Sequence, residues 1–263
     1  MKKYLFTFKF ELMTNLQYIK NLLFSFIVYF MMLFIFINLW KYIYSDPSEI
    51  INGYTLNQMI WYVIAAEVLW GTLSGRKLCK EISDDVKNGN IAYNINKPYN
   101  YILYRLSLHL GKCFVKFLIW STLSMLTGYI FLHSFPDLNI LSILAILLSA
   151  FLALVISTLL ITFIGLFSFI IEDSGPFYWV YSKLILVLGT IFPIEYFPLW
   201  AQSILKYSPI FVVSYGPSRL FVNFSWLMFT KVVIAQIIYV ILAYLLCLLV
   251  YKKGVKRLNV NGG

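Results

Sequence analysis

The chain has 263 residues, of which 61% are hydrophobic and 12% are charged, and its mean hydropathy is +0.80. This composition excludes an ordinary soluble domain, in which about a quarter of the residues are charged. The apolar runs are continuous rather than alternating, which favours membrane-spanning helices of about 20 residues over a barrel. The sequence predicts an all-α membrane protein that forms a single transmembrane domain over residues 1–263.

The net charge of +10 does not indicate a nucleic-acid-binding protein. The lysines flank apolar runs and form no basic groove with interleaved aromatic residues, so we expect no nucleic-acid partner. Three cysteines, Cys79, Cys113 and Cys247, are far apart and odd in number, which predicts neither a disulfide framework nor a metal site. His109 and His133 lie near opposite ends of a predicted span, so we expect them not to share a metal ion.

The N-terminal 20 residues are typical of an amphipathic interfacial helix. Lysines at positions 9 and 20 and other polar residues alternate with apolar ones at helical spacing, and the segment is too polar to span a bilayer. We expect this helix to lie at the cytoplasmic face with its lysines toward lipid headgroups. Its apolar side chains are Leu5, Phe8, Leu12, Leu16 and Ile19.

Six spans are predicted in chain order. The fourth is longer than a bilayer requires, so it tilts or projects into water. The spans cover about 21–42, 56–75, 111–132, 140–169, 177–192 and 226–251.

The segment 193–224 is cut into pieces by four prolines, Pro193, Pro198, Pro209 and Pro217. Apolar pieces of about ten residues are too short to span alone, which predicts two short re-entrant helices between the fifth and sixth spans, on the outer side. With the N-terminus inside, all but four of the 21 Lys and Arg lie on the cytoplasmic side. The positive-inside rule thus predicts cytoplasmic N- and C-termini in a multi-pass protein.

The loop 76–110 is the only long charged segment between spans. We expect the helix of the second span to continue past the membrane until Asn88–Gly89, where glycine permits a left-handed cap. A short exposed element, 90–97, follows, and Pro98 opens a new helix. Charges of both signs suit a surface that docks a soluble protein, although a merely solvated face has the same composition. The candidate docking residues are Glu81, Asp84, Asp85, Lys87, Gly89, Asn90, Tyr93, Lys97 and Pro98.

Glu67 is a single carboxylate inside the second span. Such a group costs a few kcal/mol unless it pairs or meets water, so it is a candidate for a transport pathway or a helix contact. The alternative is a structural hydrogen bond to a neighbouring helix. Gly71, Ser74 and Gly75 follow it, and the two glycines allow close helix approach, within one chain or between subunits.

No constellation for catalysis assembles from the sequence. There is no His-Glu-x-x-His, no Gly-x-Ser-x-Gly and no pair of intramembrane carboxylates. The segment Gly71–Lys77 lacks the spacing and the preceding strand of a phosphate-binding loop. We expect a non-enzymatic chain that binds no cofactor and cannot hydrolyse ATP by itself.

Taken in order, these features resemble the permease subunits of ABC-2-type transporters over essentially the whole chain. That family has an amphipathic first helix, six spans and a loop in which a glutamate, a glycine, a coupling element, a proline and a Gly-Lys pair follow one another. The sequence has Glu81, Gly89, 90–97, Pro98 and Gly111–Lys112 in that order. The family also has two outer re-entrant helices, which the segment 193–224 resembles.

The resemblance implies an ABC exporter in the cytoplasmic membrane. It implies a separate ATP-binding cassette subunit that carries ATP and Mg, and a second permease copy or paralogue that completes the path for a drug, lipid, peptide or glycan. The alternative is an ATP-independent transporter, a channel or an immunity protein. We see no inverted repeat with broken central helices, which a secondary transporter would favour.

Overall fold

The computed structural model describes residues 2–46, 48–73, 75–171 and 173–261, with side chains through Lys256. The first half contains α1 (Lys2–Gln17), α2 (Ile19–Ile43), β1 (Ile50–Ile51), β2 (Tyr54–Thr55), α3 (Leu56–Thr72), α4 (Arg76–Lys87), α5 (Asn90–Ile95) and α6 (Tyr101–Leu132). The second half contains α7 (Ile140–Leu166) with a 3-10 turn (Phe167–Phe169), α8 (Gly175–Ile185) with a π-helical turn (Leu186–Ile191), a 3-10 turn (Ile194–Tyr196), α9 (Leu199–Lys206), a second π-helical turn (Phe211–Tyr215), α10 (Gly216–Val222) and α11 (Trp226–Asn261).

Four helices are long and apolar enough to cross a membrane, which makes the chain a multi-pass membrane protein. Their bounds are Ile19–Ile43, Tyr101–Leu132, Ile140–Phe169 and Trp226–Lys256. The helices at the predicted second and fifth spans are shorter: α3 has 17 residues, and α8 has 11 before its π-helical turn.

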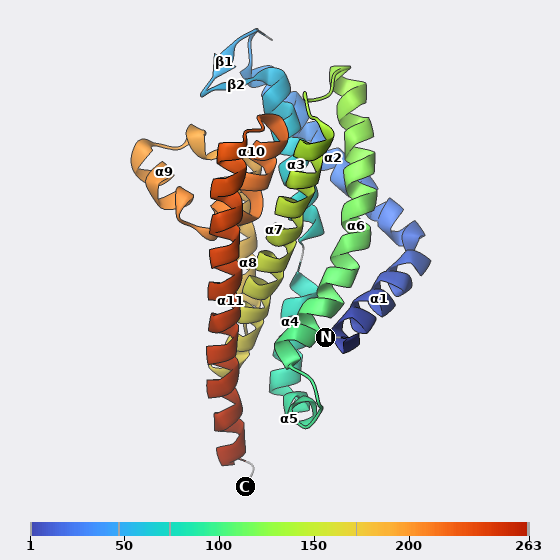
Figure 1. Cartoon of the computed structure of the whole chain (residues 1–263), viewed down its shortest axis with the longest axis vertical. Coiled ribbons are helices and arrows are strands. Elements are labelled where there is room, and N and C mark those ends of the chain that lie inside the picture. The colour runs from blue at the N-terminus through green and yellow to red at the C-terminus, as the bar shows by residue number, and fades with distance from the viewer. Residues whose placement is uncertain (1, 47, 74, 172, 262–263) are drawn as a thin grey trace.

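The helices run along the long axis of the molecule, and the connections gather at its two ends (Figure 1). At one end lie α4, α5 and the C-terminal end of α11. At the other lie the β1–β2 hairpin and the α6–α7 connection. The hairpin pairs Ile50 with Thr55 and Ile51 with Tyr54. Its turn residues, Asn52 and Gly53, both have positive φ, as expected for Asn-Gly between two strands.

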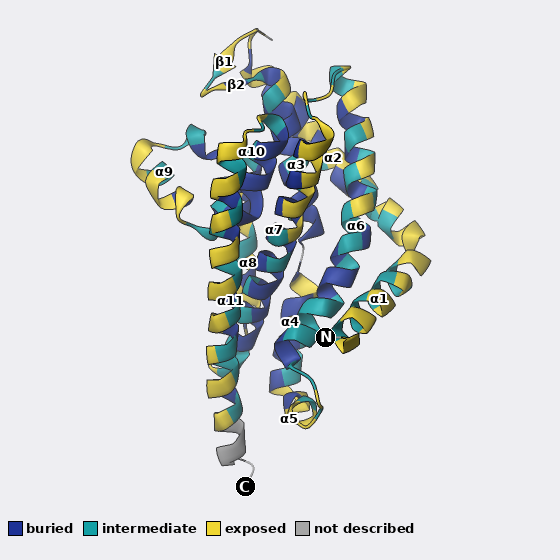
Figure 2. Cartoon of the chain, in the orientation of Figure 1, coloured by how far each residue is buried: buried dark blue, intermediate teal, exposed yellow. Residues whose placement is uncertain are grey.

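Helix α3 is the centre of the bundle. Thirteen of its 17 residues are buried, and Figure 2 shows it dark blue between more exposed helices. Thr55 and Gln58 form a capping box that fixes its start. At Gly71 an added Cβ would lie 2.2 Å from the Trp120 ring of α6. This glycine therefore lets two helices of the same chain pack closely.

Two predicted helix boundaries were wrong. The second span does not continue into the loop, because α3 ends at Thr72 and the Gly75 N–H donates to the Tyr178 hydroxyl (2.9 Å) instead of to the preceding turn. The third span does not begin near residue 111 after a separate helix opened by Pro98. One helix, α6, runs from Tyr101, because the Asn100 side chain caps the Leu103 N–H (3.1 Å).

Helix α1 packs against α6 rather than lying apart from the bundle. Of the predicted apolar face, Phe8 and Leu12 are half-buried, whereas Leu5, Leu16 and Ile19 are exposed. The contact is close at Gly111 of α6, where an added Cβ would lie 2.7 Å from the Phe8 carbonyl oxygen. Exposed apolar side chains on the rest of α1 suit an interfacial helix.

We expect Gly111→Leu to separate α1 from α6, because a backbone carbonyl cannot move aside as a side chain can. Overpacking of this kind costs about 1–3 kcal/mol. Thermal unfolding in detergent and the rate of trypsin cleavage within α1 measure the effect. Thr122→Leu, on an exposed part of α6, is the control and should change neither. Equal behaviour of both variants would contradict the close contact.

Candidate functional site

Helices α4, α5 and α6 form a hairpin, called the α4–α6 hairpin, and Arg105 of α6 links its two longer helices at the base. Its guanidinium donates to the Glu81 carboxylate (3.0 Å) and, in a very short contact, to Asp85, both on α4. The Tyr101 hydroxyl donates to Asp85 (2.6 Å) and accepts from Arg105 Nε (3.2 Å). The side chain of Arg105 is only 12% exposed and that of Asp85 only 14%, so water screens this network weakly.

Apolar packing fixes the hairpin to the rest of the bundle. Ile82 of α4 is fully buried, and its side chain lies 3.0 Å from the Cβ position of Gly165 on α7. Ile91 of α5 is also fully buried in the same cluster. Tyr101 stacks on Tyr251 of α11, with ring centroids 5.6 Å apart. The hairpin is therefore continuous with the helices α7 and α11.

The tip of the hairpin, residues 87–98, lies at the end of the molecule and is largely exposed, apart from the buried Ile91. Gly89 has φ +72°, so it turns the chain from α4 into α5 as predicted from Asn88–Gly89. Tyr93 is 69% exposed, and Lys97 lies over its ring at 4.2 Å. The tip contains the short helix α5 and presents an exposed aromatic ring to the surroundings.

The first helix contacts this tip. Lys3 of α1 donates to the carbonyl of Pro98, and the Asn100 N–H donates to the Tyr4 hydroxyl (2.8 Å). The interfacial helix is thereby attached to the segment that leads from α5 into α6. A movement of α5 would be transmitted to α1 as well as to α6.

The candidate docking residues fall into three groups. Glu81 and Asp85 face Arg105 inside the chain, so they stabilise the base. Asp84 and Lys87 line a groove between α4 and the start of α8. The others lie at or beside the tip: Gly89, Asn90, Tyr93, Lys97 and Pro98. The sequence analysis missed Arg105. A cation four residues after Tyr101 on an otherwise apolar helix face was the signal that could have revealed it.

Glu67 is completely buried in α3, and neither of its carboxylate oxygens has a hydrogen-bond partner among the described residues. Helices α6 and α2 are joined by a hydrogen bond that Ser124 donates to the Tyr29 hydroxyl (3.0 Å). Gly75 packs against Ile161 of α7 at 2.4 Å, measured from an added Cβ. Of this predicted polar face, Ser74 lies outside the described residues. The structure places Glu67 in the interior, and among the described residues no neighbouring helix supplies a hydrogen bond to its carboxylate.

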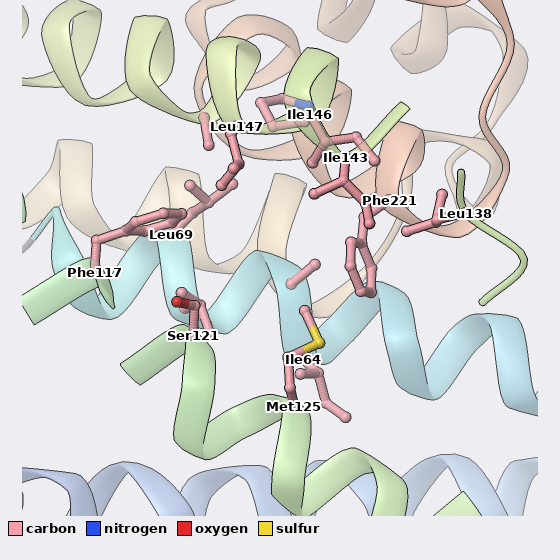
Figure 3. A pocket seen from close by; sticks show the side chains of 14 residues that line it. Ile64, Leu69, Phe117, Ser121, Met125, Leu138, Ile143, Ile146, Leu147 and Phe221 are labelled. Carbon is pink, nitrogen blue, oxygen red and sulfur yellow. The ribbon is translucent and has the colours of Figure 1, made fainter. Parts of the chain in front are cut away.

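An apolar pocket of about 120 Å³ lies on another face of α3 (Figure 3). Its walls come from α3, α6, α7 and α10, and Figure 3 shows Phe117, Met125 and Phe221 among the side chains that line it. Glu67, Gly71 and Gly75 do not line it. The predicted pathway residues and this pocket therefore do not form one site.

A second polar cluster, which the sequence analysis also missed, lies toward the opposite end. Glu195 accepts from the hydroxyls of Tyr54 (3.1 Å) and Tyr215 (2.5 Å). Arg219 lies 3.9 Å from the same carboxylate and over the Tyr54 ring. Burial raises the pKa of Tyr54, so its hydroxyl keeps its proton and remains a donor. The cluster joins the β1–β2 hairpin to the segment between α8 and α11.

No group of three His, Cys, Asp or Glu that could hold a metal ion occurs in the part of the chain that the structure describes. The described residues form a set of apolar helices around a central α3, with a polar hairpin at one end. The family model described as "ABC-2 family transporter protein" matches residues 26–262. The chain belongs to the ABC-2 family of transporter proteins. A comparison with curated proteins gave no match.

We expect Arg105→Gln to loosen the hairpin, because it leaves the Asp85 carboxylate buried without its cation. Removal of one partner from a buried pair costs about 3 kcal/mol. Thermal unfolding in detergent is the measurement, and Arg76→Gln, at an exposed position of α4, is the control, with a change below about 0.5 kcal/mol. The double variant with Asp85→Asn should recover part of the loss; strictly additive losses would contradict a direct interaction.

We expect Glu67→Leu to stabilise the chain by about 2 kcal/mol, because a buried polar group without a partner is replaced by an apolar one. Glu67→Gln keeps the shape and polarity and should leave stability unchanged. Unfolding in detergent and transport by the intact complex are measured together. Raised stability with lost transport would assign Glu67 to the pathway, whereas lowered stability would show that a group in the protein holds its carboxylate.

Proposed function

We propose that this chain is the permease subunit of an ABC-2-type exporter whose energy comes from a separate ATP-binding cassette subunit. The observation that carries the proposal is the hairpin with an exposed tip, residues 87–98, on a base held by Arg105. ATP and Mg bind to the ATPase. When the ATPase closes, it pushes α5, and the rigid base transmits the displacement to α6, α7 and α11.

The proposed membrane arrangement has six spans, with α3 and α8 as the second and fifth. Helix α3 is shorter than the four long helices and is buried at the centre of the bundle, whereas α8 is extended by its π-helical turn. The segment 193–224 contributes two short re-entrant helices, α9 and α10, on the outer side. Both termini then lie in the cytoplasm, and the hairpin faces the ATPase from the cytoplasmic membrane.

A second permease, either a copy or a paralogue, completes the translocation path. The support is an exposed apolar face that runs along α8 into its π-helical turn, formed by Phe177, Val180, Leu184 and Val187, all at least 42% exposed. These positions recur at intervals of three and four residues, as on one side of a helix. The exported substrate belongs to the drug, lipid, peptide or glycan classes that such permeases carry.

The decisive experiment replaces residues 90–97 by a Gly-Ser linker of equal length. We expect the permease to insert normally but to lose co-purification with its ATP-binding cassette subunit and to lose stimulation of ATP hydrolysis, because the pushed element is gone. The matched control replaces residues 48–53, at the opposite end of the molecule, and should retain both. Unchanged association and unchanged ATPase stimulation in the 90–97 variant would contradict the docking proposal.

A further inference from the structure

A pocket of about 160 Å³ lies between α1, α4 and α6 and is separate from the exposed tip. A water molecule occupies about 30 Å³ in the liquid, so the pocket has room for a polyatomic ion. Asn15 and Leu22 form its wall near the α1–α2 junction, and α6 contributes one side from Arg105 to Lys116. It lies next to α1, the helix whose remaining surface is apolar and exposed.

The lining of this pocket is rich in cations. Four cationic side chains, Lys77, Arg105, Lys112 and Lys116, face a single lining carboxylate, Glu81. Arg105 is balanced by its two carboxylate partners, and Lys112 lies 3.5 Å from Glu11. Among the described residues, Lys77 makes no ion pair within 4.0 Å, so the lining carries positive charge beyond what its carboxylates neutralise.

Two residues that line the pocket, His109 and Thr72, each have a buried polar side-chain atom without a hydrogen-bond partner in the described part of the chain, namely His109 Nε2 and Thr72 Oγ1. His109 is 7% exposed and Thr72 is 2% exposed. Buried polar groups without partners are rare in proteins, and a bound ion or water is one way to satisfy them. A hydroxyl and an imidazole N–H can both donate to an anion.

Lys116 lies at the inner end of the same lining. It donates to the Gly71 carbonyl (2.7 Å) and lies over the Trp120 ring at 4.0 Å. The carbonyl belongs to α3, so the pocket reaches the central helix. An anion bound here would contact groups on α3, α4 and α6 at once.

We propose that this pocket binds a phosphate group, either the headgroup of an anionic phospholipid or a free phosphate. The shared chemistry is a tetrahedral anion that accepts from the Lys77 ammonium and from the buried Thr72 and His109 side chains. The adjacent exposed face of α1 provides a place for acyl chains when the source is a lipid. The proposal stands independently of which ATPase or substrate the permease serves.

The bound phosphate would link the interfacial helix α1 to α4 and α6, the two longer helices of the hairpin. Lys77 lies on α4, one turn before Glu81, and Lys112 lies on α6 against Glu11 of α1. Occupancy would draw these three helices together. The protein would then hold its hairpin more firmly in a membrane rich in anionic lipid than in a neutral one.

The test measures thermal unfolding and binding for the purified full chain in a neutral detergent. Phosphatidylglycerol, phosphatidylcholine and inorganic phosphate are titrated separately. We expect phosphatidylglycerol to raise the unfolding temperature and phosphatidylcholine not to do so. A matching rise with inorganic phosphate would show that the pocket takes the free ion too, whereas a rise with the lipid alone would assign it to a headgroup.

Lys77→Gln should weaken the binding about tenfold, the effect of one charge-assisted hydrogen bond. Thr72→Val removes one of the buried donors and should weaken it as well. Lys80→Gln, three residues further along α4 and lining the other groove, is the matched control and should bind like the natural chain. Two results would overturn the proposal. In one, both lipids shift the unfolding temperature equally and inorganic phosphate has no effect. In the other, the Lys77 and Lys80 variants bind equally well.

Discussion

The ion network of Arg105 is the interaction on which the hairpin depends. A short helix such as α5, of six residues, has little stability by itself, because helix nucleation is costly and its hydrogen bonds are few. It keeps its place because α4 and α6 are fixed to each other by a guanidinium that contacts two carboxylates and a tyrosine hydroxyl. Without this ion network, a force on α5 would bend the hairpin instead of moving the bundle.

The rest of the molecule suits the transmission of such a push. The central helix α3 is buried on nearly all sides, and glycines bring it into direct contact with its neighbours. Close-packed interiors respond as units rather than by gradual deformation. At the far end, Glu195 and its tyrosine partners hold the β1–β2 hairpin to the short helices before α11. Polar clusters thus secure both ends of an apolar bundle.

Much of this architecture could be predicted from the sequence because hydrophobic length and turn chemistry are local signals. The first and fourth spans, the end of α4 at Asn88–Gly89 and the proline-divided segment follow directly from composition and spacing. The start of α6 did not, because Pro98 and Asn100 offer competing signals two residues apart. The Asn100 side chain decides the boundary through a hydrogen bond that the sequence does not display.

The candidate site was harder to predict than the fold, for a physical reason. Glu81 and Asp85 have the composition of a docking surface, but their partner Arg105 lies 24 and 20 residues away on another helix. Which side of a helix faces its neighbour depends on packing across the whole bundle. The pocket with His109 and Thr72 joins side chains from different helices, and no spacing rule brings such residues together.

The most direct test of the account is a cross-link between the hairpin tip and the ATP-binding cassette subunit. All three native cysteines are buried, so Tyr93→Cys introduces one exposed thiol at the tip. A single cysteine is placed on the facing surface of the ATPase, and a short bifunctional thiol reagent is added. The account predicts a cross-link from position 93 and none from Ile50→Cys at the opposite end of the molecule. A cross-link from position 50 with none from position 93 would contradict it.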